Sequence, residues 1–292
     1  MCDQCDDPVD HSVEHSVDRR LFLRRAVAGG ITVMAGTALF PAAAEAGRAT
    51  AKGTTVGTRA VTVDPPSIVT RAQWGADEKI RDSARVFAPI RKLVVHHSAS
   101  PNHPADPASV VRDIYTLHVK GRGYQDIGYN FLIDHHGVVY EGRWARAYPA
   151  GQLHDGEDGH GRGVMGGHAT TVNAGACGVC LIGDFTFALP STAALTSLVQ
   201  LLAWKAGRFM IDPSGADPFA PPYGAVATFP NIVGHRGVGS TVCPGRGANS
   251  QLPWVRSEVQ QQVGRFPAVT LDLLHALHFT NGASYPKPTL KK

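Results

Sequence analysis

Apolar residues along the chain alternate between short runs that are typical of buried strands and longer patterns with helical spacing. The run from Arg91 to Val95 contains one Leu and two Val and ends in a histidine pair, which predicts a buried strand. Asp106 then provides a helix N-cap with Pro107 at the first helical position, and the apolar residues that follow recur with helical spacing. The sequence therefore predicts a strand followed by a helix.

The next segment predicts a hairpin and then a long loop. Two β-prone runs, Gly128 to Asp134 and Val138 to Glu141, are joined around Gly137, as in a hairpin. Residues 147–174 are rich in Gly and His and lack any period, so we expect a loop there. The apolar run at 177–182 predicts another buried strand.

The last third of the chain predicts two more helices and one more strand. After Pro190, leucines and a valine recur with the spacing of an amphipathic helix. Residues 212–230 contain five prolines and are expected to be irregular, and a strand at Ile232 and Val233 leads into His235. A final helix is expected from Pro253 to Val263.

These elements predict a single α/β domain over residues 67–265, with a central mixed β-sheet flanked by helices and no internal repeat. Residues 47–66 are rich in Thr, Gly and Ala without periodicity, which predicts a linker. Residues 266–292 are expected to form a C-terminal tail. The frequent Gly and Pro favour many irregular connections, and therefore an active site built from loops.

Residues 1–46 have the features of an export signal. Two arginine pairs, 19–20 and 24–25, precede an apolar run from Ala26 to Phe40 and an Ala-Glu-Ala sequence at 44–46. The segment resembles a twin-arginine signal, although Asp18 stands where Ser or Thr is usual. The apolar run is shorter than the roughly 20 residues of a membrane span, so cleavage near Ala46 is favoured over a retained anchor. We expect a secreted, periplasmic or cell-wall-associated protein.

The charge balance changes when this segment is removed. Its loss takes away four arginines and seven acidic residues, so the formal net charge rises from +4 to +7. A basic protein suits anionic cell-wall polymers, and charge alone would suit nucleic acid equally well. Because no RNA-binding or helix-turn-helix signature accompanies the charge, we do not expect a nucleic-acid partner.

Cys177 and Cys180 form a CxxC sequence, but they lie in a predicted strand. Residues three apart in a strand point to opposite faces and lie roughly 10 Å apart, beyond the roughly 7 Å limit between Cα atoms for a disulfide. We therefore expect two small buried residues there. Cys243 requires a different explanation.

Histidines and a cysteine at two strand ends indicate a metal site. His96 and His97 close the first predicted strand, while His235 and Cys243 follow the last one. Two imidazoles and one thiolate suit tetrahedral zinc with an open fourth position. Adjacent strand residues face opposite sides, so only one of the His pair should bind, and the pattern does not say which. Tyr129 could either supply its phenol hydroxyl to this site or pack as an aromatic residue in the core.

Five segments together resemble the peptidoglycan recognition protein family, which is related to phage and bacterial zinc amidases. They occur in the family's order between residues 67 and 262: Ile68-Val-Thr-Arg-Ala-Gln-Trp-Gly-Ala76, Val95-His-His-Ser98, Asp126-Ile-Gly-Tyr-Asn-Phe-Leu-Ile133, Gly137-Val-Val-Tyr-Glu-Gly-Arg143 and Gly234-His-Arg with Thr241-Val-Cys-Pro-Gly245.

The resemblance implies an N-acetylmuramoyl-L-alanine amidase, which hydrolyses the amide bond between N-acetylmuramic acid and L-alanine of peptidoglycan. It makes His96, His235 and Cys243 the zinc ligands and Tyr129 the catalytic tyrosine that orients the attacking water. Thr241 occupies the position where phage enzymes carry Lys, so zinc and Thr241 would stabilise the oxyanion. The intact ligand set favours an amidase over a non-catalytic recognition module or a zinc hydrolase acting on another wall amide.

Other positions are expected to contact the substrate or solvent. By the same resemblance, His118, Arg143 and His168 could line the binding groove. The loop with His154 and His160 departs from the family pattern, and its acidic stretch 155–158 lacks the ligand spacing of a calcium loop, which predicts a solvated loop. The expected partner is peptidoglycan, with no stable membrane span after signal cleavage, and the protein is expected to be a monomer.

Overall fold

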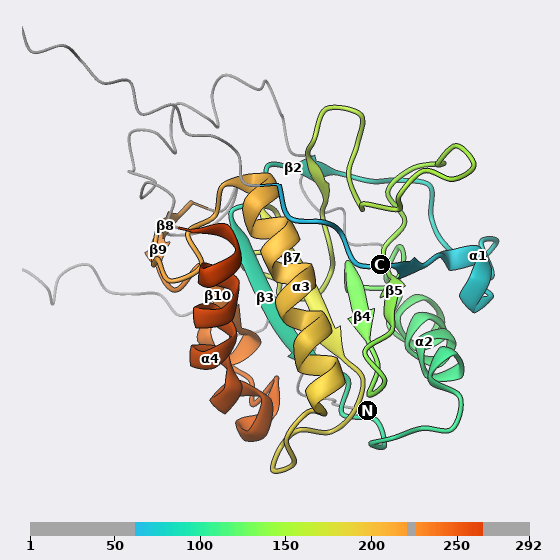
Figure 1. The fold of residues 1–292 in the computed structure, drawn as a ribbon. Coiled ribbons are helices and arrows are strands. Elements are labelled where there is room, and N and C mark those ends of the chain that lie inside the picture. Colours follow the sequence, from blue (N-terminus) through green and yellow to red (C-terminus); the bar gives the residue numbers. More distant parts are fainter. Residues whose placement is uncertain (1–61, 221–225, 265–292) are drawn as a thin grey trace, which may run out of the picture. The chain divides into compact units, whose positions relative to one another are not determined.

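A six-stranded mixed sheet in the order β1-β5-β4-β7-β3-β10 forms the centre of the computed structural model, which describes residues 62–220 and 226–264 (Figure 1). The β4–β5 pair is antiparallel and every other pair in this sheet is parallel. The strands are β1 (Ile68–Val69), β3 (Lys92–His97), β4 (Phe131–Ile133), β5 (Val139–Glu141), β7 (Ala176–Leu181) and β10 (Ile232–Gly234). The predicted fold class is confirmed.

Helices cover both faces of this sheet. Helices α3 (Thr192–Phe209) and α4 (Gly245–Val263) lie side by side across one face (Figure 1). On the other face, residues of α2 (Pro107–Thr116) form a second apolar cluster with residues of β4, β5 and β7. The short helix α1 (Arg71–Trp74) packs against α2, and a π-helical turn (Leu117–Gly121) continues α2.

Several local predictions are confirmed. The Asp106 side chain caps α2 by accepting a hydrogen bond of 3.1 Å from the Ser109 backbone N–H. The hairpin between β4 and β5 turns at Gly137, which has a positive φ of 84°. Cys177 packs in the core under α3 and α4, while Cys180 packs in the core on the α2 side. Of the cysteines in the described ranges, none forms a disulfide.

Helix α4 begins eight residues before its predicted start at Pro253. The first-turn N–H groups of Arg246 and Gly247 donate to the carbonyls of Thr186 and Phe185, at 3.2 and 2.9 Å. These long-range partners satisfy groups that a helix end leaves unpaired, so the helix can begin at Gly245, and Pro253 lies inside it. The predicted boundary was wrong because local sequence does not reveal such partners.

The segments expected to be irregular contain two small ribbons. In the loop 147–174, β6 (Gly163–Val164) pairs with β2 (Phe87–Ala88). In the proline-rich segment, β8 (Pro218–Phe219) pairs with β9 (Ala227–Thr228), while residues 221–225 lie outside the described ranges. Proline fits such short strands because they need few backbone donors.

The prediction that residues 155–158 form a solvated loop was wrong for Glu157, which is 1% exposed. Lys205 and Arg208 of α3 bind its carboxylate at 2.9 and 3.1 Å. A carboxylate can remain buried in this way only with such charged partners. These two ion pairs therefore hold the acidic loop against α3.

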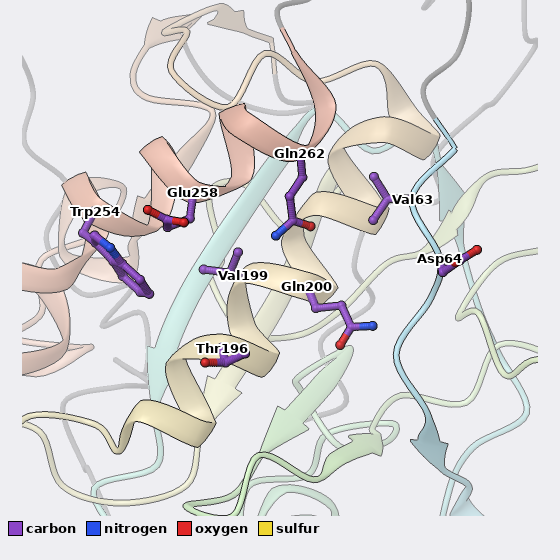
Figure 2. Close-up of a pocket in the computed structure, with 8 residues that line it drawn as sticks. All are labelled: Val63, Asp64, Thr196, Val199, Gln200, Trp254, Glu258 and Gln262. Carbon is purple, nitrogen blue, oxygen red and sulfur yellow. The ribbon is translucent and has the colours of Figure 1, made fainter.

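A cavity of about 480 Å³ lies between α3, α4 and the extended segment that precedes β1 (Figure 2). Val63, Thr196, Trp254 and Glu258 are among the residues that line it. It lies on the α3 and α4 side of the sheet.

The predicted signal (1–46) and tail (266–292) lie outside the described residues, as does most of the predicted linker (47–66). Within the described ranges, no helix is long and apolar enough to cross a membrane.

Candidate metal centre

Two neighbouring parallel strands bring the candidate ligands together. His96 lies near the end of β3, and His235 follows the end of β10 in a single 3-10 turn (His235–Gly237). Cys243 lies between this turn and α4. One ligand atom from each residue lies within 4.8 Å of the other two, and all three residues are buried. Within the described residues, this trio is the His/Cys/Asp/Glu group whose donors could hold a metal ion.

Alternation along β3 decides which histidine joins the group. The His96 ring lies 4.6 Å from the His235 ring, centroid to centroid. The His97 ring lies instead near Phe185, and its Nδ1 accepts a hydrogen bond of 3.1 Å from the Phe185 backbone N–H. The two rings thus point to opposite faces of the strand, as their adjacent positions predict.

The environment favours an unprotonated imidazole at His96. Burial lowers the pKa of His96 well below its ordinary value, and the neighbouring histidines, His235 first, lower it further. His96 Nδ1 lies 3.7 Å from Cys243 Sγ, and the backbone N–H of His97 donates to the same sulfur at 3.4 Å.

This donor set fits zinc. Zinc–nitrogen bonds of roughly 2.0–2.1 Å and zinc–sulfur bonds of about 2.3 Å place tetrahedral ligand atoms roughly 3.5 Å apart. The 3.7 Å between His96 Nδ1 and Cys243 Sγ is close to that value, and the 4.8 Å limit for the trio requires only a small closing movement of the side chains. Three protein donors leave one position open, which is typical of catalytic zinc.

Tyr129 and Thr241 lie beside this group. Tyr129 precedes β4, is 4% exposed, and has its ring 5.2 Å from that of His96. Tyr129 also belongs to the apolar cluster under α2. It therefore lies both beside the candidate metal site and in the core, the two positions that the sequence left open. Thr241 Oγ1 accepts a hydrogen bond of 3.2 Å from the Cys243 backbone N–H, which ties the hydroxyl to the ligand loop.

The three predicted substrate contacts are all buried. His118 lies 5.5 Å from the Tyr129 ring, and its Nδ1 accepts a hydrogen bond from the Gly128 backbone N–H at 3.0 Å. Arg143 donates to the Ile127 carbonyl and to Gln125. His168 is 2% exposed and reaches His96 directly, with 3.0 Å between His168 Nδ1 and His96 Nε2. That these residues contact a substrate stays a prediction.

Two asparagines that sequence reasoning left unassigned position this region. The Asn130 side chain donates to the Val164 carbonyl and accepts from the Gly178 N–H, both at 2.8 Å. Asn173 accepts hydrogen bonds from the backbone N–H groups of His168 and Ala169. Asn130 lies within one of the family motifs, but a buried amide that links two strands, β6 and β7, has no local signature.

Zinc content tests the ligand assignment. We expect the purified protein to carry one zinc ion per chain and Cys243→Ala to lose it, because two imidazoles alone form a much weaker site. The matched control is Cys177→Ala, which also removes a buried thiol but leaves the trio intact. Mass spectrometry for metals provides the measurement. Equal zinc in both variants would contradict the assignment.

Buried neutral histidines predict a pH dependence of stability. Burial first, then Arg122 and Arg143, lowers the pKa of His118 from 6.5 to about 3. Between pH 6.5 and about pH 3, the unfolded chain binds a proton at His118 and the folded chain does not. The free energy of unfolding therefore falls as the pH drops below about 6.5. His118 should contribute about 2 kcal/mol of loss between pH 7 and pH 5.

Urea unfolding of the zinc-free protein at both pH values measures this effect. His118→Gln keeps an acceptor near the Gly128 N–H but cannot titrate, so its loss between the two pH values should be smaller by about the same 2 kcal/mol. An identical loss in wild type and variant would show that His118 does not remain neutral.

Comparisons with known proteins identify the family of this chain. Residues 86–246, more than half of the chain, match the family model described as N-acetylmuramoyl-L-alanine amidase. Peptidoglycan recognition protein 1 of Bos taurus is 32% identical over 185 residues, which cover 62% of this chain and 80% of that protein. The N-acetylmuramoyl-L-alanine amidase of Sus scrofa is 30% identical over 184 residues, 62% of this chain but 26% of that longer protein. The solved structure of wild-type PGRP-LB from Drosophila is 26% identical and covers 64% of this chain and 92% of its own, with a TM-score of 0.48. The chain therefore belongs to the N-acetylmuramoyl-L-alanine amidase family, with peptidoglycan recognition proteins among its relatives.

Proposed function

We propose that this protein is a zinc-dependent amidase that hydrolyses the bond between N-acetylmuramic acid and the L-alanine of peptidoglycan. The observation that carries the proposal is the complete set of His96, His235 and Cys243, buried and gathered within 4.8 Å, with Tyr129 beside it. A module that only recognises its ligand has no chemical need for this set. Family membership supports the reaction class.

When bound, zinc would act as a Lewis acid that polarises the amide carbonyl and generates a nucleophile at neutral pH. The neutral His96 offers its lone pair to the metal without competition from a proton. The Tyr129 hydroxyl would hydrogen-bond the attacking water and orient it. The Thr241 hydroxyl would donate to the developing oxyanion, while its bond from the Cys243 N–H limits its movement. Cleavage leaves a lactyl carboxylate and a free amino group on L-alanine.

His118 and Arg143 are proposed to contact the stem peptide. Both lie on the Tyr129 side of the centre, and Arg143 offers a cationic group in a largely buried position. A guanidinium held in such a place can bind a carboxylate or a peptide carbonyl strongly, because water competes little for it. We further propose that the protein acts as a monomer.

The competing proposal is a peptidoglycan-binding module without activity. The names of several relatives, such as peptidoglycan recognition protein 1, describe recognition rather than cleavage. The full set of metal ligands favours the amidase, because peptidoglycan binding alone does not require a buried thiol beside two buried imidazoles.

Release of new amino termini from purified peptidoglycan tests the amidase. The form beginning at Gly47 should release peptides with L-alanine at the amino end. Tyr129→Phe should lower kcat by roughly 10²-fold, because one oriented hydrogen bond to the reacting water is lost. Cys243→Ala should release none.

Binding of the same wall material provides the control. Cys243→Ala should still bind peptidoglycan, which would separate lost chemistry from lost folding. A wild-type protein that carries zinc and binds the wall but releases no new termini would rule out the amidase and leave the recognition module.

We also propose that residues 1–46 direct export by a twin-arginine route. The paired arginines, the apolar run and the Ala-Glu-Ala sequence support this. Protein recovered outside the cytoplasm should begin at Gly47, as read by mass spectrometry of the intact chain. An exported protein that retains residues 1–46 would contradict cleavage.

A further inference from the structure

We propose that His168 is a positioning residue for the metal centre: its Nδ1 accepts a hydrogen bond from His96 Nε2–H and fixes the ring orientation and tautomer of that ligand. This inference rests on the proposed zinc site, but not on the amidase reaction. In this proposal His168 supports the metal ligand His96 and does not contact the substrate.

The two nitrogens of His96 have different partners. Nδ1 lies 3.7 Å from Cys243 Sγ, on the side of the candidate metal, and Nε2 lies 3.0 Å from His168 Nδ1. A metal-binding nitrogen must carry a lone pair, so in a neutral ring the hydrogen resides on the other nitrogen. His96 Nε2 is then a donor, and His168 Nδ1 must be its acceptor.

The surroundings of the His168 ring leave space for it and hold its backbone. A side chain at Gly178 of β7 would place its Cβ only 2.4 Å from the ring, and one at Gly166 would place it 2.5 Å away. Two glycines therefore leave the space that the ring occupies. On the backbone side, Asn173 holds the N–H groups of His168 and Ala169 at 2.9 and 2.8 Å.

The arrangement leaves His96 little rotational freedom. Its ring meets the His168 ring edge-on, at 4.9 Å between centroids and an interplanar angle of 78°, and meets Tyr129 and His235 on other sides. A flip of His96 would move a protonated nitrogen toward the sulfur and break the bond to His168. Partners of this kind commonly change metal affinity 10- to 100-fold when they are removed.

Zinc affinity of His168 variants tests the proposal. His168→Leu fills much of the space without an acceptor and should weaken zinc binding roughly 10- to 100-fold in competition with a chromophoric chelator. His168→Asn places a carbonyl oxygen near the position of Nδ1 and should recover most of that loss. Cys177→Ala, the control used for the ligand assignment, should leave zinc affinity unchanged.

A ring-displacing variant probes the same bond without removing the histidine. Gly178→Ala forces the His168 ring to move and should weaken zinc binding as His168→Leu does. Urea unfolding of each zinc-free variant separates lost affinity from lost stability.

The tautomer itself can be read by nitrogen-15 NMR of the zinc-loaded wild-type protein, which involves no altered fold. We expect His96 to carry its proton on Nε2, with slow exchange, and that signal to vanish in His168→Leu. A proton on His96 Nδ1, or equal affinity losses in His168→Leu and His168→Asn, would overturn the inference. Failure of the amidase alone would appear differently, as normal zinc affinity and the expected tautomer without amide cleavage.

Discussion

The side-to-side alternation of residues along β3 is the constraint on which the rest of the centre depends. Leu93 and Val95 point into the core beneath α3 and α4, so His96 must point the other way. Each of these apolar side chains contributes roughly 1.5–3 kcal/mol when buried, and a shift of one residue in the pairing with β7 and β10 would turn them away from this core. The hydrophobic core thus fixes which histidine faces the candidate metal.

Electrostatics adds a second constraint, because the centre gathers several imidazoles where water is excluded. Burial lowers the pKa values of His96, His118 and His168, so all three rings stay neutral at ordinary pH. Neutral rings are what metal binding and directed hydrogen bonds require. The same condition makes the fold sensitive to acid. One thiolate among neutral ligands would leave a bound zinc ion with net positive charge, which preserves its power to polarise a carbonyl.

Sequence patterns predicted the elements near the centre well, because their signals are local. The buried strand before His96, the Asp106 cap and the turn at Gly137 depend on neighbouring residues. The patterns did not show which histidine of the pair would bind, although the family resemblance selected His96. They also missed the start of α4 and the burial of Glu157, since the partners at Phe185 and Lys205 lie far away along the chain. Long-range pairing of this kind has no signature in a single sequence.

The physical cost of the cluster also bears on the choice between cleavage and recognition. A buried thiol and two buried imidazoles are polar groups withdrawn from water, and each is costly unless it has a partner. The His97 N–H and His168 satisfy part of this need, while His96 Nδ1 and Cys243 Sγ lie only 3.7 Å apart. Apolar residues would fill that volume with less destabilisation if the module only had to bind a ligand elsewhere on its surface. A cation that accepts all three donors would offset the cost, and the Tyr129 ring lies beside the ligand His96 that would hold it. The arrangement therefore supports the proposed chemistry at a metal over binding alone.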